Sequence, residues 1–164
     1  MAADLPSSPT PKLRLAVQAA LDAGDLPARS TLRRWLLRAL RRDATVTVRF
    51  VGAAEGRRLN RDFRGRDYAT NVLTFAYDAP ASIGAKPLSG TALHGDIVLC
   101  VPVLRREARA AQTTLRAHCA HLVIHGALHL QGFDHESGKD AKVMEALETR
   151  LLAALGYGDP YTTN

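Results

Sequence analysis

The sequence lacks the features that mark secreted and membrane proteins. Its 164 residues include two cysteines, Cys100 and Cys119, which are too few for a disulfide framework. Both cysteines lie among apolar residues, so we expect them to be small, buried hydrophobic side chains. No apolar run is long enough to span a bilayer, and we recognise no signal peptide. We therefore expect a cytoplasmic protein without membrane contact.

Common catalytic signatures and internal repeats are also missing. We find no glycine-rich phosphate loop and no Ser/His/Asp arrangement. The length fits one domain that is large enough to bury a core. Residues 1–11 contain three prolines and two serines, which predicts a disordered leader, and residues 12–164 are expected to form the single domain.

The apolar pattern predicts an α+β fold. Alternating or continuous apolar runs predict strands at residues 12–21, 45–51, 71–77 and 95–101, although the alanines within 12–21 leave a helix possible there. Helical spacing and end signals predict helices at residues 30–40, capped by Ser30, and at 53–64, 103–111, 115–130 and 139–155. In the second of these helices we expect Leu59 and Phe63 to point inward. The prolines, glycines and serines of residues 78–94 predict a long loop. The order of elements predicts one mixed sheet of about four strands with helices packed on it.

Positive charge is concentrated in the first part of the chain. The formal net charge is +6, and residues 12–66 hold 14 Lys and Arg against 5 Asp and Glu, whereas residues 67–164 hold 8 against 10. Such clustering indicates a polyanionic partner, nucleic acid first and an acidic membrane surface second. A high-GC coding preference would also enrich arginine, and composition does not decide between the two. The arginines of the first predicted helix are accordingly either solvated or in contact with RNA; they are Arg33, Arg34, Arg38, Arg41 and Arg42.

The segment from His121 to His135 carries the strongest chemical signal. In the predicted helix, His125 and His129 lie one turn apart on the same face. Gly132 can then take the left-handed conformation that ends the helix and lets His135 return to them. Three imidazoles suit a transition metal, zinc first, and leave a fourth position open, as in catalytic rather than structural sites.

The same spacing occurs in a family of zinc peptidases, the metzincins. Their motif is H-E-x-x-H-x-x-G-x-x-H, and residues 125–135 match its three histidines and its glycine. Gly126 stands where the motif has glutamate, which is the general base of those enzymes. The chain is therefore expected to have a zincin-like metal helix without the peptidase base, which disfavours peptide hydrolysis.

Several neighbouring residues have two possible roles. His121 either faces the metal ligands or RNA, or is a hydrogen-bonded core histidine. Asp134 and Glu136 either orient a metal-binding histidine or cap the last helix. Asp96 either orients a histidine or begins a strand, and no role is expected for His118.

Four segments resemble the YbeY family of bacterial endoribonucleases and ribosomal RNA maturation factors. The similarity covers most of the chain from Lys12 onward, and its segments are HLVIHGALHLQGFDH at 121–135, LNRDFRGRDYATNVLTF at 59–75, HGDIVLC at 94–100 and MEALETRLLAALGY at 144–157. The chain differs in having Ala69 where the family often has proline, and Thr74-Phe75-Ala76 where it has Ser-Phe-Pro.

The resemblance implies a metal-dependent, single-strand-specific RNase. Such an enzyme acts in ribosomal RNA maturation, notably at the 3′ end of the small-subunit RNA, and in ribosome quality control. It implies one zinc ion per chain on His125, His129 and His135, a functional arginine at Arg64, and partners comprising single-stranded and ribosomal RNA, the small ribosomal subunit and its assembly factors.

The chemistry expected of these groups is phosphoryl transfer. A metal ion would polarise a phosphoryl oxygen, and the Arg64 guanidinium would donate to the same phosphate as charge develops. The base is either hydroxide formed at the metal or the RNA 2′-hydroxyl, and the sequence does not choose. Two alternatives to the RNase are a ribosome-assembly factor that binds RNA with little catalysis and a metallopeptidase-like hydrolase.

Overall fold

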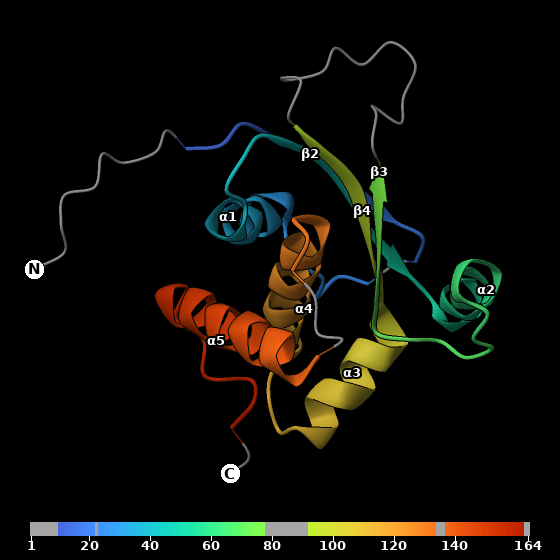
Figure 1. Ribbon diagram of the computed structural model, residues 1–164. Helices are drawn as coiled ribbons and strands as arrows, with labels where there is room; N and C mark the ends of the chain where they lie inside the picture. The colour runs from blue at the N-terminus through green and yellow to red at the C-terminus, as the bar shows by residue number, and fades with distance from the viewer. Residues whose placement is uncertain (1–9, 22, 78–91, 134–136, 163–164) are drawn as a thin grey trace, which may run out of the picture.

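A four-stranded mixed sheet organises the computed structural model, which describes residues 10–21, 23–77, 92–133 and 137–162 (Figure 1). The α+β class and the mixed sheet predicted from the sequence are confirmed. The elements in chain order are β1 (Leu13–Ala19), α1 (Arg29–Ala39), β2 (Ala44–Val51), α2 (Ala53–Arg64), β3 (Val72–Tyr77), β4 (Leu93–Cys100), α3 (Val101–Ala110), α4 (Leu115–Leu130) and α5 (Gly138–Ala154).

The strand order is β1-β2-β4-β3. Strands β1, β2 and β4 are mutually parallel, and β3 pairs antiparallel with β4 at one edge. Because side chains alternate across a strand, β4 sends Ile97 and Leu99 to one face and Val98 and Cys100 to the other. The sheet therefore contributes to two separate apolar clusters.

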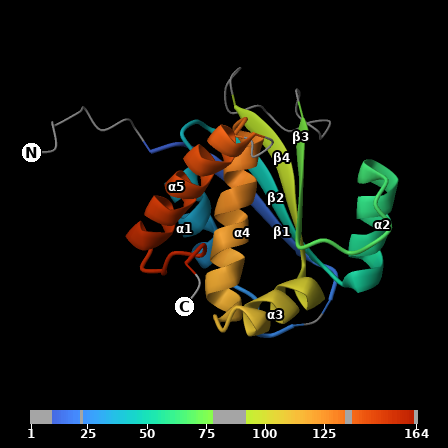
Figure 2. The same cartoon turned by 60° about the horizontal axis from the view of Figure 1, so that its bottom comes forward.

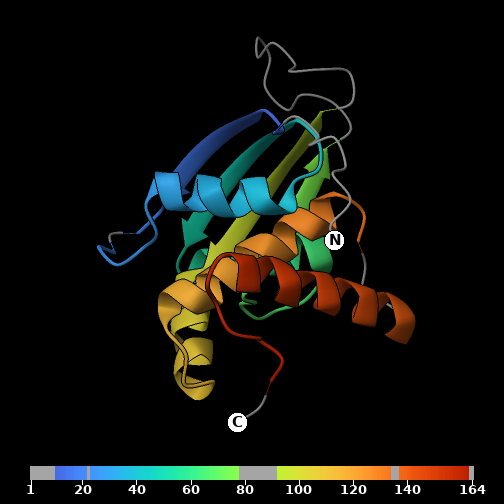
Figure 3. The same cartoon turned by 90° about the vertical axis from the view of Figure 1, so that its left-hand side faces the viewer.

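Helices cover the two faces of the sheet unequally. Helices α1 and α4 pack on the first face, with α5 outside α4, and Figure 3 shows all three in front of the strands. Helix α2 lies across the sheet from α4 (Figure 2), where Leu59 packs against the smaller apolar cluster, which includes Val98 and Cys100. The larger apolar cluster, including the fully buried Trp35, lies between the sheet and α1 and α4. Helix α2 thus covers the second face, and Val103 of α3 contributes to the smaller cluster there.

The ends of α4 follow from local sequence signals. The Thr114 hydroxyl accepts a hydrogen bond from the Ala117 N–H at 3.0 Å, which caps the first turn. At the other end Gly132 has a φ of 95°, and the N–H groups of Gly132 and Phe133 donate to the carbonyls of His129 and Leu128. This is the glycine-terminated helix end expected from the sequence.

Some element boundaries differ from the predicted ones. Helix α1 begins at Arg29, and its N-cap residue Ala28 makes no side-chain capping bond, so Ser30 lies inside the helix instead of capping it. Helix α3 begins at Val101 because proline is tolerated in the first turn, where its missing N–H has no partner to lose. Strand β4 begins before Asp96, which therefore does not start a strand. Residues 78–91 of the predicted loop lie outside the described residues.

The prediction that Phe63 points inward is wrong. The Phe63 side chain is 66% exposed, and its ring meets Phe75 edge-on with centroids 5.3 Å apart. Small and polar residues form the buried side of α2 instead, namely Gly56 and Asn60. A Cβ at Gly56 would lie 3.0 Å from the Cys100 Sγ, so α2 packs closely on β4 at this point. Both cysteines are buried, as expected.

The described residues give no indication of a membrane-spanning helix. Among the residues described, no helix combines the length and the apolar character that crossing a bilayer requires.

The contact of β4 with α4 gives a first prediction. A Cβ at Gly95 would lie 2.5 Å from Leu130 Cδ2 and 2.9 Å from the Phe75 carbonyl oxygen, which belongs to the backbone and cannot move alone. We expect Gly95→Ala to lower the free energy of unfolding by about 1–3 kcal/mol, as overpacked sites do. Urea unfolding would measure this, with Gly24→Ala as control because a Cβ there meets nothing within 4 Å. Equal midpoints for the two variants would contradict the packing argument.

Candidate metal centre

Four histidines lie along one stripe of α4. They are His118, His121, His125 and His129, all partly buried, and each ring meets the next nearly edge-on, with centroids 6.2, 6.3 and 5.0 Å apart in that order. Their spacing of three or four residues accounts for the stripe because such residues are neighbours on a helix surface. The structure thus brings His125 and His129 together, as the sequence predicts.

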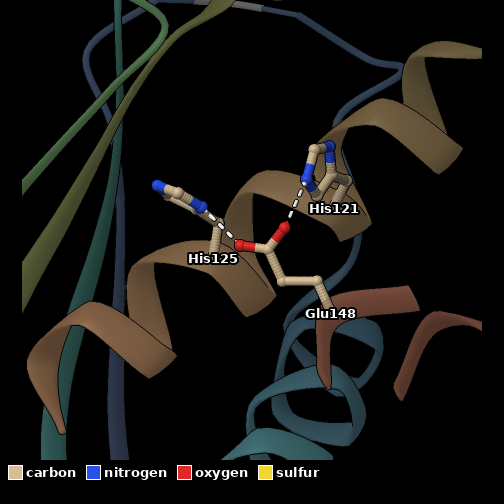
Figure 4. A group of neighbouring side chains, drawn as sticks. All are labelled: His121, His125 and Glu148. Carbon is tan, nitrogen blue, oxygen red and sulfur yellow. Dashed lines mark hydrogen bonds and ion pairs between the residues drawn. The ribbon is translucent and has the colours of Figure 1, made fainter. Parts of the chain in front are cut away.

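A buried carboxylate on α5 holds two of these histidines. Glu148 is fully buried, and its Oε1 lies 2.5 Å from His125 Nδ1 while its Oε2 lies 3.0 Å from His121 Nε2 (Figure 4). The Tyr161 hydroxyl also donates to Oε2. Burial alone would raise the pKa of Glu148, but the hydrogen bonds from His121, His125 and Tyr161 outweigh it and lower the pKa to about 2. Glu148 is therefore ionised at neutral pH.

The ionised carboxylate fixes the tautomer of His125. A carboxylate only accepts hydrogen bonds, so His125 Nδ1 must carry the proton of this bond. In the neutral imidazole the lone pair then lies on Nε2, which is the atom that would bind a metal. A carboxylate behind a metal-binding histidine is a recurrent arrangement because it orients the ring and raises its basicity. The donor set therefore fits the predicted zinc site at His125 and His129.

A second group of possible ligands overlaps the first. The potential ligand atoms of His121, His125 and Glu148 all lie within 4.8 Å of one another, so these residues could also bind a metal ion. Two of their contacts, at 2.5 and 3.0 Å, are hydrogen-bond distances. Ligand atoms around a tetrahedral zinc ion would be roughly 3.4 Å apart, given bonds of about 2.1 Å. In this conformation Glu148 thus acts as a hydrogen-bond acceptor.

The third predicted ligand cannot be placed in the same way. His135, together with Asp134 and Glu136, lies outside the described residues. The N-cap of α5 is Ser137, whose hydroxyl accepts from the Asp140 N–H at 3.1 Å. The return of His135 to the other two histidines stays a prediction.

Other candidate residues lie away from the pair. Asp96 faces the side of the sheet that α2 covers and accepts a 2.7 Å hydrogen bond from the Tyr77 hydroxyl. His118, for which no role was expected, lies 2.9 Å from Glu107. Arg64 is the exposed last residue of α2, across the sheet from α4 (Figure 1). The structure therefore does not bring Arg64 into the histidine group, and its role stays a prediction.

Sequence analysis missed Glu148 and Tyr161. A signal for Glu148 was available, because it lies among the apolar positions of α5 that are buried, with Met144 before it and Leu152 after it. A charged residue on an apolar stripe is rarely buried without a partner. Tyr161 follows the last helix and carries no comparable periodic signal.

Gly126 has a packing role that the sequence does not reveal. A Cβ at this position would lie 3.0 Å from Ile97 Cγ2 on β4. The nearest atoms all belong to the Ile97 side chain, so any side chain at this position, glutamate included, would require Ile97 or the helix to shift.

The family model and the curated relatives that match this sequence name one family. The family model described as Endoribonuclease YbeY matches residues 26–156. A protein named Endoribonuclease YbeY from Aromatoleum aromaticum is 56% identical over 153 residues, which cover 92% of this chain and 93% of that protein. Another of that name from an Azoarcus species is 54% identical over 162 residues, covering 96% of this chain and 64% of that longer protein. A solution structure of TM1509 from Thermotoga maritima aligns with a TM-score of 0.47 at 22% identity, over 90% of this chain and 99% of that one.

The two overlapping ligand groups make opposite predictions for metal content. If the metal is held by His125 and His129, His129→Ala loses bound zinc after dialysis, whereas His121→Ala keeps most of it. Metal analysis of the purified variants would measure this, with His118→Ala as control because His118 lies on the same stripe but pairs with Glu107. Loss of zinc from His121→Ala alone would instead assign the metal to His121, His125 and Glu148.

The hydrogen bond from His125 to Glu148 gives a further prediction. Glu148→Gln keeps the size of the side chain but removes its charge, so His125 loses its charged acceptor. We expect zinc affinity to fall about 10- to 100-fold, the usual effect of removing such a partner. A titration against a competing chromophoric chelator would measure it, with Glu145→Gln on the exposed side of α5 as control. Wild-type affinity in Glu148→Gln would show that the carboxylate does not support the metal site.

Proposed function

The chain belongs to the YbeY endoribonuclease family, and on that premise we propose that it is a metal-dependent endoribonuclease that cuts single-stranded RNA. We assign its activity to ribosomal RNA maturation, notably at the 3′ end of the small-subunit RNA, and to ribosome quality control in the cytoplasm. The observation that carries the proposal is the buried Glu148 carboxylate that orients His125 beside His129.

In the proposed site, His125, His129 and His135 hold one zinc ion. Three neutral ligands would leave the full positive charge on the zinc ion. When bound, the ion would polarise a phosphoryl oxygen and lower the pKa of a water molecule. Glu148 keeps the proton of His125 on Nδ1 and prevents the ring from turning. Gly126 stands where those peptidases have their glutamate base, and a side chain there would press on Ile97, which argues against the metallopeptidase alternative.

Arg64 is proposed to bind an RNA phosphate. Its guanidinium presents several N–H donors in a fixed plane, which suits the phosphate oxygens of RNA. Because α2 and α4 lie on opposite sides of the sheet, this position favours a phosphate other than the one at the histidines. Arg64 would then position the strand and not contact the reacting phosphate.

The basic surface of α1 supports RNA as the partner. Residues 29–42 contain six arginines and no acidic residue, and all six side chains are exposed. They are Arg29, Arg33, Arg34, Arg38, Arg41 and Arg42. The Arg41 guanidinium lies 5.6 Å from the centre of the Phe133 ring, next to the glycine turn that leads toward His135. Such a row attracts a polyanion, and its binding would weaken as salt is added. Ribosomal RNA in the small subunit and its assembly factors are the partners that we propose.

Cleavage assays on matched variants test the proposal. We expect wild-type protein to carry about one metal ion per chain and to cut single-stranded RNA in preference to duplex RNA. His129→Ala should lose both metal and cleavage. Arg64→Ala should keep the metal and cut at least about tenfold more slowly, because a charge-assisted contact to RNA is lost. Arg109→Ala, an exposed arginine of α3, serves as control.

A different outcome would favour the assembly-factor alternative. If the protein binds RNA but His129→Ala and Arg64→Ala cut as fast as wild type, the nuclease in the preparation is a contaminant. The family fold would then serve RNA binding with little catalysis of its own.

A further inference from the structure

A hollow of about 580 Å³ lies on the face of the sheet that α2 covers, away from the histidines. Its walls come from α2, from the edge strand β3 and from the neighbouring strands β4 and β2. The lining residues that carry the argument are Phe63, Phe75, Tyr77, Asp96, Arg49 and Glu55. Pockets of this volume commonly take a small organic molecule or one unit of a polymer.

Aromatic side chains at the hollow are unusually exposed. Phe63 is 66% exposed and Tyr77 is 40% exposed, although aromatic side chains usually contribute to a protein core. The Phe63 ring is held edge-on against Phe75, which projects from β3 into the same hollow. This contact holds the Phe63 ring in place while most of the side chain stays exposed to solvent. Exposed apolar side chains gathered at a cavity mark a binding site more often than scattered ones do.

Polar and charged groups complete the hollow. The Asp96 carboxylate accepts from Tyr77, and the Arg49 guanidinium donates to Glu55 at 2.6 and 3.2 Å. A carboxylate has acceptor sites beyond one hydrogen bond, so Asp96 could also accept from the amino group of a ligand. Residues 49–67 carry six arginines against three acidic residues, which gives the surroundings of the hollow a positive charge. An aromatic platform within a basic surface suits an anionic polymer with planar rings.

We propose that the hollow binds a nucleobase of the single-stranded RNA, stacked on Phe63, while the arginines of α2 hold neighbouring phosphates. This inference rests on the proposed function and adds a second RNA contact to it. Proteins that bind single strands combine aromatic side chains, on which bases stack, with a basic groove that follows the backbone. Sheet surfaces with exposed aromatics recognise RNA in the same way.

The position of β3 connects the hollow with the histidine site. Strand β3 is the edge of the sheet, and α4 contacts it from the other face (Figure 1). An RNA strand can therefore pass around this edge and contact both faces. A fragment of two or three nucleotides at the histidines would be too short to reach the hollow as well. The contribution of Phe63 should then depend on RNA length.

The test uses the full-length protein and substitutions of the exposed Phe63. A single-stranded decanucleotide with one 2-aminopurine reports both affinity and stacking, since the fluorescence of this base is quenched when it stacks. For Phe63→Ala we expect about a tenfold rise in Kd and loss of quenching, as for the removal of one base-stacking residue. Phe63→Trp should restore both, which a merely structural role would not require. Val143→Ala, at an apolar residue of α5 that is 54% exposed, is the control.

Changing the length of the RNA and removing its bases distinguish the possible outcomes. For a long substrate we expect Phe63→Ala to raise KM with kcat unchanged, and for a dinucleotide we expect no effect. A decanucleotide with abasic sites throughout should bind wild type and Phe63→Ala equally. If RNA is bound and cut by both proteins with the same Kd and KM, the inference is wrong while the proposed nuclease stands. If wild type binds no single-stranded RNA, both the nuclease and the inference are wrong.

Discussion

The hydrogen bonds that the buried Glu148 carboxylate accepts are the interaction on which the fold and the site both depend. An ionised carboxylate withdrawn from water costs several kcal/mol unless hydrogen bonds replace its hydration. Here the bonds come from two histidines of α4 and from Tyr161, beyond the end of α5. The same contacts that make Glu148 tolerable in the core therefore fix how α5 lies on α4. They also set the ring orientation of His125, so the site cannot be altered at this point without loosening the helical layer.

Close packing of α4 on the sheet is the second constraint. Gly126 lies against Ile97, and Gly95 lies against Leu130, so each element offers a glycine where the other has a branched side chain. This complementarity brings α4 into contact with both β4 and the edge strand β3. It also accompanies a chemical difference from the metzincins, because the position of their catalytic glutamate is occupied here by a glycine that packs on Ile97 of the sheet. Packing and catalytic chemistry are thus linked through one glycine.

The structural features that could be predicted from the sequence are those that local interactions determine. The period of β2 and the helix-ending Gly132 both depend on neighbours within a few residues, and the structure confirms them. The pairing of His125 with His129 follows from the same helical geometry. The residues that were wrongly predicted or missed, Phe63 and Glu148, depend on partners elsewhere in the chain. Phe63 leaves the core because Gly56 and Asn60 form the buried side of α2, and Glu148 acquires its role from histidines more than twenty residues earlier. The apolar spacing of α5 could indicate that Glu148 is buried, but no spacing rule within one helix reveals its histidine partners on α4.

Selectivity for single strands can arise on the face opposite the histidines. A base can stack on the Phe63 ring only when it has left its own stack, and a base in a duplex must first be unpaired and turned out, which costs a few kcal/mol. A single strand avoids that cost. At the histidines the reacting group would be a phosphodiester, which is chemically the same in paired and unpaired RNA, so that group alone would not distinguish the two. If the hollow holds a base, strand selectivity and phosphoryl chemistry are therefore divided between the two faces of one sheet, and β3 is the edge around which the RNA must pass.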